Sequence, residues 1–154
     1  MKRINKNQTF ENFSVNDGNA WALATLKTVI KDKSYYNPVY IYGEEGVGKS
    51  HLLNATINAI VELNKVAFLS AKELSDEMVE KLTVSDVDYI LIDDLNLLPK
   101  DINLEEKLAM LIEENKKQLI ISSTVDPKNM EVCSKLQERL QWGLTTNMTS
   151  KIND

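Results

Sequence analysis

One stretch of this sequence, GEEGVGKS at residues 43–50, has the residue types and the spacing that bind a nucleoside triphosphate. It fits G-x-x-x-x-G-K-[ST] at each defined position, a pattern in which glycines let backbone N–H groups cradle phosphates. The lysine is suited to bridge the β- and γ-phosphates, and the serine hydroxyl is suited to bind Mg²⁺. We therefore expect ATP or ADP to bind here with Mg²⁺; a chance match is a weak alternative, because an apolar run precedes the loop and a helical pattern follows it. The expected contacts within the loop are Gly43, Gly46, Val47, Gly48, Lys49 and Ser50.

A second candidate site is the acidic end of the apolar run at residues 89–92, which is followed by Asp93 and Asp94. An aspartate at such a strand end commonly holds Mg²⁺ beside a phosphate loop, directly or through water. Asp93 is the candidate metal ligand, and Asp94 is the candidate general base that polarises the attacking water. A plain loop cap is the alternative for this pair, but the position downstream of the glycine-rich loop favours the metal.

Two weaker candidates lie further along the chain. Ser122, Ser123 and Thr124 follow a third apolar run, and two interpretations of their hydroxyls carry equal weight. They either contact the γ-phosphate or the attacking water, or they cap the turn before Pro127. Arg139, from composition alone, is an ordinary surface arginine.

Short apolar runs that alternate with helical patterns must position these side chains. The predicted strands cover residues 39–42, 66–69, 89–92, 119–121 and, more weakly, 144–148. The predicted helices cover residues 20–30, with Trp21 and Leu26 among the possible inward positions, and residues 50–63, 75–81 and 104–116. Continuous apolar strands indicate burial on both faces, and their alternation with helices indicates right-handed crossovers on a parallel sheet. The expected fold is α/β: a three-layer α/β/α P-loop NTPase with a five-stranded parallel sheet.

Composition excludes several classes of protein. The chain has 154 residues, 43% hydrophobic and 27% charged, which fits a folded domain rather than a disordered chain. Its net charge of −5 argues against direct DNA binding in isolation, because a nucleic-acid binder needs a basic face. No apolar run approaches the roughly 18 residues of a membrane span, and residues 1–10 lack a signal-peptide core, so a cytoplasmic protein without a membrane partner is expected. The single cysteine, Cys133, excludes an internal disulfide.

Five short motifs stand in a specific order along the chain. They are TFENF at residues 9–13, Asn37-Pro38, GVGKSHLL at residues 46–53, the segment 86–95 that ends in IDDL, and RLQWGL at residues 139–144. Together they resemble the AAA+ ATPase domain of the DnaA/Hda family of bacterial replication proteins. The resemblance implies a nucleotide-binding domain, with Walker A and Walker B motifs, that acts in or regulates the initiation of chromosomal DNA replication.

The resemblance also implies roles for residues near the nucleotide. Phe10, Phe13 and Val15 would lie near the adenine. His51, the only histidine, would lie in the binding segment, where packing or capping is favoured over catalysis. In the same way Lys49 and Ser50 would serve phosphate and Mg²⁺.

Three catalytic positions follow from the same resemblance. Asp94 would take the position of the catalytic acid beside the metal ligand Asp93, and Thr124 that of sensor 1. Arg139 would be the arginine finger, which acts on ATP bound to a neighbouring subunit. Because fingers of this type contribute roughly 10³–10⁵ in rate, hydrolysis by a monomer is expected to be slow.

The family pattern is only partly present, which leaves three functions open. Residues 1–8, with basic Lys2, Arg3 and Lys6, are expected to be a solvated tail, and residues 9–154 a nucleotide-binding core without a lid subdomain or a helix-turn-helix. The first function is a DnaA/Hda-like nucleotide switch that contacts an AAA+ partner, either a DnaA-like initiator or a second copy of the chain. The others are a non-catalytic adaptor on the same fold and a helicase-loader-like ATPase.

Overall fold

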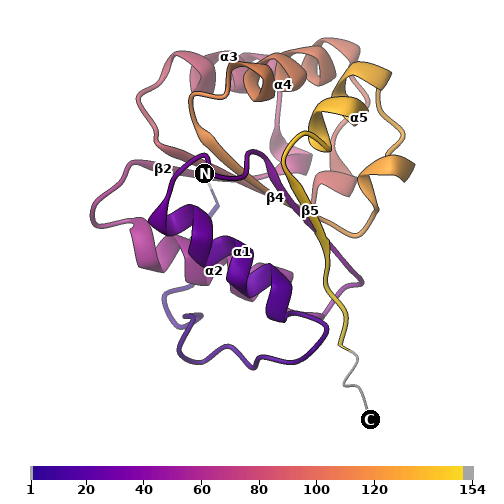
Figure 1. Cartoon of the computed structure of the whole chain (residues 1–154). Coiled ribbons are helices and arrows are strands. Elements are labelled where there is room, and N and C mark those ends of the chain that lie inside the picture. Colours follow the sequence, from indigo (N-terminus) through magenta and orange to yellow (C-terminus); the bar gives the residue numbers. More distant parts are fainter. Residues whose placement is uncertain (1, 151–154) are drawn as a thin grey trace.

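A parallel five-stranded sheet lies between two layers of helices in the computed structural model of the chain, which describes residues 2–150 (Figure 1). The strands are β1 (Val39–Tyr42), β2 (Val66–Ser70), β3 (Tyr89–Asp93), β4 (Gln118–Ser123) and β5 (Leu144–Asn147). Their order across the sheet is β2-β3-β4-β1-β5, and each neighbouring pair is parallel. The predicted three-layer α/β/α fold with a five-stranded parallel sheet is therefore confirmed.

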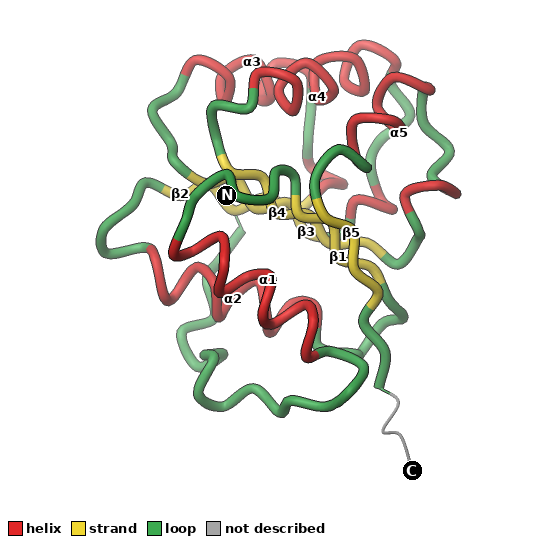
Figure 2. The backbone as a smooth tube through the Cα atoms, in the orientation of Figure 1, coloured by secondary structure: helices red, strands yellow, loops and turns green. Residues whose placement is uncertain are grey.

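The two helical layers cover opposite faces of this sheet (Figure 2). One layer contains α1 (Ala20–Lys31) and α2 (Lys49–Ile60), and the other contains α3 (Asp76–Val84), α4 (Ile102–Glu114) and α5 (Ser134–Leu140). Three short 3₁₀ helices, η1 (Ala71–Glu73), η2 (Leu95–Leu97) and η3 (Pro127–Asn129), lie in the connections. The sequence prediction located each α-helix except α5, whose seven residues are too few to display a helical period.

Buried strand residues divide between two apolar cores, because successive side chains of a strand point to opposite faces. On β3, Ile90 and Ile92 pack under α3, α4 and α5, whereas Leu91 packs under α1 and α2. This double burial explains why the strands are continuous apolar runs in the sequence. In α1, Leu26 is fully buried, but Trp21 is 63% exposed, so the prediction of Trp21 as an inward position is wrong.

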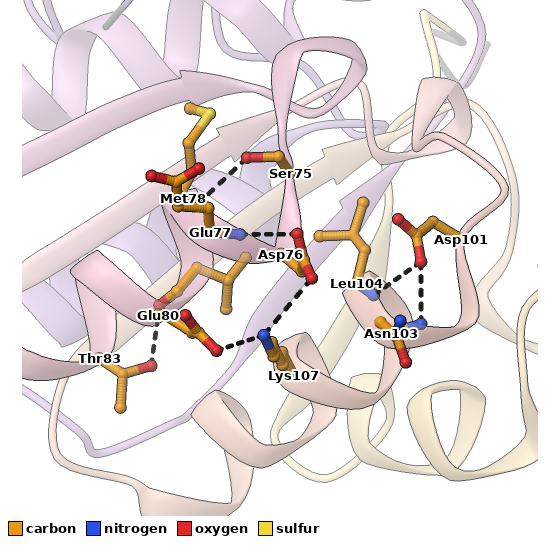
Figure 3. A network of polar contacts seen from close by, with 11 residues as sticks. Ser75, Asp76, Glu77, Met78, Glu80, Thr83, Asp101, Asn103, Leu104 and Lys107 are labelled. Carbon is orange, nitrogen blue, oxygen red and sulfur yellow. Dashed lines mark hydrogen bonds and ion pairs between the residues drawn. The ribbon is translucent and has the colours of Figure 1, made fainter.

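Polar contacts attach α3, which precedes β3 in the chain, to α4, which follows β3 (Figure 3). Lys107 of α4 forms ion pairs with Asp76 and Glu80 of α3. Both helices also begin at a capped N-terminus. The Ser75 hydroxyl accepts a hydrogen bond from the Met78 N–H at 3.2 Å, and the Asp101 carboxylate accepts one from the Asn103 N–H at 2.9 Å.

Replacing Asp101 by alanine is expected to lower the free energy of unfolding by about 1 kcal/mol, because the first-turn N–H groups of α4 lose their acceptor. Urea unfolding followed by circular dichroism measures this difference. The control is Asp101→Asn, which keeps an acceptor oxygen and is expected to unfold close to the wild type. An alanine variant as stable as the asparagine variant would contradict the capping role.

Candidate functional site

The glycine-rich loop connects β1 to α2 at the carboxyl edge of the sheet, where binding sites of open α/β sheets lie. Gly46 and Gly48 have φ angles of 84° and 106°, which side-chain-bearing residues rarely adopt. Gly43 continues β1 by donating its N–H to the Ser123 carbonyl at 3.1 Å, and Val47 packs partly into the core beneath α1 and α2. The loop therefore has the backbone that its sequence pattern predicts.

Lys49, the first residue of α2, directs its ammonium group back into this loop. It donates hydrogen bonds to the Gly43 carbonyl and, at 2.7 Å, to the Glu44 carbonyl. The residue is only 6% exposed. Burial lowers the pKa of Lys49, against the opposing charges of Asp94 and Asp93. The ammonium thus lies at the loop's centre, near the N-terminus of α2.

Asp93, the last residue of β3, is 1% exposed and receives polar contacts from three other segments. The Ser122 hydroxyl of β4 donates to its Oδ1, and the Ser50 hydroxyl donates to its Oδ2 at 3.2 Å. Lys2 forms an ion pair with Oδ2. Burial opposes ionisation of Asp93, but the hydrogen bonds from Lys2, Ser122 and Ser50 outweigh it and lower the pKa. The expected solvated tail is therefore wrong for Lys2, because the buried carboxylate attracts its amine.

Asp94 follows with a left-handed backbone, φ 58°, and its N–H donates to the Ser122 hydroxyl at 3.0 Å. Burial and the neighbouring charge of Asp93 raise the pKa of Asp94. The two adjacent carboxylates therefore differ, Asp93 being the stronger acid and Asp94 the better proton acceptor.

A cavity of about 390 Å³ brings Asp94 together with the glycine-rich loop. Its lining residues are Gln8, Glu45, Gly46, Gly48, Lys49, Ser50, His51 and Asp94. Gln8 was not predicted as a site residue, because nothing in its type or spacing distinguishes it from a loop glutamine. Its side-chain oxygen accepts a hydrogen bond from the Asn54 amide of α2 at 3.0 Å, and this contact holds it at the cavity.

The aromatic segment before α1 lies partly against this loop. The Phe13 ring is 5.2 Å from the His51 ring in an edge-to-face arrangement, and Phe13 is 9% exposed. His51 Nε2 lies 2.9 Å from the Thr9 carbonyl oxygen, so His51 links α2 to this segment. Phe10 packs at the border of the same core, whereas Val15 is 57% exposed, and neither lines the cavity.

Ser123, Thr124 and Arg139 lie outside the cavity lining. The Ser123 hydroxyl accepts the Val125 N–H at 3.0 Å, so it caps the turn, whereas Ser122 contacts Asp93. The Thr124 N–H donates to the Asn96 side-chain oxygen at 3.1 Å, which attaches this strand end to the segment after β3. The capping interpretation therefore applies to Ser123, whereas a contact of these hydroxyls with the γ-phosphate or the attacking water stays a prediction.

Arg139, on α5, is held by its own chain. Its Nε and one terminal nitrogen lie 2.7 and 2.6 Å from Glu113 Oε1, and its guanidinium carbon lies 4.4 Å from the centre of the Trp142 ring. The Arg139 side chain is 17% exposed. The guanidinium is thus fixed by Glu113 and Trp142, and Arg139 does not line the cavity of its own chain.

The oxygen atoms of Ser50 at the cavity and of Asp93 beside it fit Mg²⁺ bound with a nucleotide. Within residues 2–150, no group of three His, Cys, Asp or Glu side chains is arranged to hold a metal ion alone. Mg²⁺ characteristically uses one or two carboxylates together with water and substrate phosphates. The Ser50 hydroxyl and the Asp93 carboxylate supply such a partial set beside a loop suited to phosphates.

Among the helices of this described part of the chain, none is long and apolar enough to cross a membrane.

Comparison with known proteins places this chain in a family. The sequence matches the bacterial DnaA ATPase domain over residues 4–147. The chromosomal replication initiator protein DnaA of Streptococcus thermophilus is 32% identical over 166 aligned residues, covering 95% of this chain and 37% of that protein. The chain therefore spans little more than a third of the length of this curated relative.

Solved structures agree with the sequence match. Domain III of the Thermotoga maritima replication initiation protein DnaA has a TM-score of 0.85 at 29% identity, over 96% of this chain and 69% of that chain. AMPPCP-bound DnaA from Aquifex aeolicus has a TM-score of 0.86 at 28% identity, over 97% of this chain and 52% of that chain. The DnaI structure, at 16% identity and a TM-score of 0.72, covers 93% of this chain and 88% of its own, and shares the fold alone. With a family match along most of its length, this chain belongs to the bacterial DnaA ATPase domain family.

Proposed function

We propose that this domain binds ATP or ADP together with Mg²⁺ in the cavity at the carboxyl edge of the sheet. The observation that carries the proposal is the meeting of Lys49, Ser50 and Asp94 at one cavity, with Asp93 3.2 Å from the Ser50 hydroxyl. Lys49 and the loop N–H groups would bind the phosphates. The relative from Aquifex aeolicus with AMPPCP bound supports the assignment.

Ser50 and Asp93 would hold the metal in this proposal. Mg²⁺, when bound, neutralises charge on the phosphates and orients them. Asp94 would accept the proton of the attacking water, a role that fits its raised pKa. Ser122 would keep both aspartates in place, since its hydroxyl contacts the Asp93 carboxylate and the Asp94 N–H.

The nucleotide would act as a switch for contacts with an AAA+ partner in the initiation of chromosomal DNA replication. That partner is either a DnaA-like initiator or a second copy of the chain. Two observations support this: the matched relatives are replication initiators, and Arg139 lies outside the cavity of its own chain. Hydrolysis would then be slow in the monomer and would depend on an arginine supplied across an interface.

Thermal unfolding with and without ATP and Mg²⁺ tests nucleotide binding. At a ligand concentration 100 times Kd, the free energy of unfolding rises by about 2.7 kcal/mol, which corresponds to a rise in Tm of roughly 5–10 °C for a domain of this size. The Lys49→Ala variant is expected to lose this rise, because the buried ammonium is the principal cation of the loop. Lys116→Ala, at an exposed position before β4, is the control and is expected to respond like the wild type.

A wild type whose Tm is unchanged by millimolar ATP and Mg²⁺ would contradict nucleotide binding. The adaptor that binds a partner without nucleotide would then be the better function. Equal responses of the Lys49→Ala variant and the wild type would mean that the ligand binds elsewhere.

A further inference from the structure

Residues 2–8, which we call the N-terminal strap, lie along α2 instead of extending into solvent. The Asn5 N–H donates to the Asn54 side-chain oxygen at 2.8 Å. The Asn58 side-chain amide donates to the carbonyl oxygens of Asn5 and Gln8 at 3.0 and 2.8 Å. Two asparagines one turn apart on α2 thus bind the middle and the end of the strap.

The start of the strap is attached to the edge strand of the sheet. The Lys2 N–H donates to the Phe68 carbonyl of β2 at 2.7 Å, and the Lys2 ammonium lies 5.3 Å from the centre of the Phe68 ring. These contacts direct the side chain across the end of β3, where it forms the ion pair with Asp93. The position of the ammonium is therefore set by its own backbone and by α2.

The oxygen that Lys2 contacts is the one nearest the predicted metal site. Asp93 Oδ2 accepts the ion pair from Lys2 and the hydrogen bond from the Ser50 hydroxyl. The Asp93 side chain is 1% exposed, so its charge needs a partner, whereas the Lys2 side chain is 34% exposed. The amine can therefore turn toward water when another cation takes its place at Asp93.

We propose that Lys2 competes with Mg²⁺ for Asp93, so that the strap sets the Mg²⁺ concentration at which the nucleotide site fills. This inference rests on the proposed function. Two cations at one carboxylate oxygen oppose each other, because their like charges repel, and most strongly where little solvent is present. Without the metal, the ammonium neutralises Asp93. With Mg²⁺ bound at this oxygen, directly or through a water, the metal takes over that task and Lys2 turns outward.

The test uses Lys2→Met, which keeps a long flexible side chain and removes the charge. Mg²⁺ is titrated at a fixed excess of AMPPCP while binding is followed by calorimetry. The Mg²⁺ midpoint of the variant is expected to fall by about three- to tenfold relative to the wild type, the factor that a partly exposed ion pair provides.

Thermal unfolding gives a second measurement that is independent of hydrolysis. Without nucleotide and Mg²⁺, Lys2→Met is expected to melt below the wild type, because Asp93 loses its partner. At saturating Mg²⁺ and AMPPCP, the two Tm values are expected to converge, because the metal replaces the ammonium in the wild type.

Two matched variants separate competition by Lys2 at Asp93 from a general effect of the charge of the strap. Lys6→Met removes a charge from an exposed position of the same strap and is expected to keep the wild-type midpoint. Lys2→Arg keeps the charge and is expected to keep most of the competition. A wild-type midpoint in Lys2→Met, or an equal fall in Lys6→Met, would overturn the inference while nucleotide binding stands. A wild type without Mg²⁺-dependent AMPPCP binding would instead overturn the proposed function.

Discussion

Replacing Gly143 by alanine is expected to lower the free energy of unfolding by about 3 kcal/mol or more, because the added methyl group has no room. A Cβ at this position would lie 2.0 Å from the Pro38 carbonyl oxygen and 2.6 Å from the Asn37 carbonyl carbon. Both are backbone atoms, so no side-chain rotation relieves the overlap. The expected fall in Tm is roughly 10 °C.

The segment that the methyl group would strike cannot move away. The Pro38 carbonyl accepts the Leu144 N–H at 3.0 Å, the hydrogen bond at which β5 joins β1. On the other side, the Asn37 side-chain oxygen accepts the Leu119 N–H of β4 at 2.9 Å. A shift of Asn37 and Pro38 would therefore break contacts to two strands at once.

Gly46→Ala provides the control for this prediction, measured by the same thermal and urea unfolding. Gly46 also resists substitution, but through its φ of 84° alone, since a Cβ there meets no atom within 4 Å. The expected loss is about 1–2 kcal/mol, the cost of a left-handed backbone. A Gly143→Ala variant that is more stable than Gly46→Ala would contradict the prediction, because it would mean that the backbone of Asn37 and Pro38 moves to make room for the methyl group.

The contact at Gly143 also gives a physical reason for two of the motifs seen in the sequence. Asn37-Pro38 and the Trp-Gly pair at residues 142–143 are separated by about a hundred residues, and only a family resemblance singles them out in the sequence. In the structure they touch where β5 begins. Neither motif has a local pattern that reveals this contact, because it depends on the order of strands in the sheet.

Much of the candidate site followed from the sequence because it depends on strand ends. Parallel strands end at one edge of the sheet, so the loop after β1 and the aspartates at the end of β3 are expected at the same edge once the strands are identified. The contact between Ser50 and Asp93 at 3.2 Å confirms that expectation. The roles of these residues in binding nucleotide and metal remain predictions.

Other parts of the site could not be predicted, since they arise from contacts between distant segments. Lys2 and Asp93 are 91 residues apart, and a basic N-terminal segment has the composition of a solvated tail. Arg139 and Glu113 meet because α4 packs against α5, a helix too short to be seen in the sequence. In both cases the partner of a charged side chain is decided by tertiary packing.

Under the proposed function, Arg139→Ala is expected to reduce ATP turnover in an assembly about 10³-fold or more, while leaving the nucleotide-dependent rise in Tm intact. The reason for this separation is that Arg139 does not line the cavity of its own chain. Its guanidinium would act on a nucleotide bound to a neighbouring subunit, where it stabilises charge on the transferring phosphate. Steady-state phosphate release, measured over a range of protein concentrations, checks the effect.

Mixing two inactive variants tests whether the arginine acts across an interface. Lys49→Ala lacks the loop ammonium but keeps Arg139, and Arg139→Ala lacks the guanidinium but keeps the loop. If the finger acts in trans, the mixture is expected to regain a substantial fraction of wild-type turnover, because some interfaces combine an intact loop with an intact arginine. Wild-type turnover by Arg139→Ala alone would contradict the role.

Glu113 orients the Arg139 side chain. It contacts two nitrogens of Arg139, while the Trp142 ring lies against the guanidinium, so contacts within the chain alone orient the group. If this orientation serves hydrolysis, Glu113→Gln lowers turnover by about tenfold, and the double variant Glu113→Gln, Arg139→Ala is no slower than Arg139→Ala alone. If Glu113 instead withholds the arginine, Glu113→Gln raises turnover. A fall in the turnover of Glu113→Gln would therefore mean that Glu113 orients Arg139 for hydrolysis, and a rise would mean that Glu113 keeps Arg139 from acting.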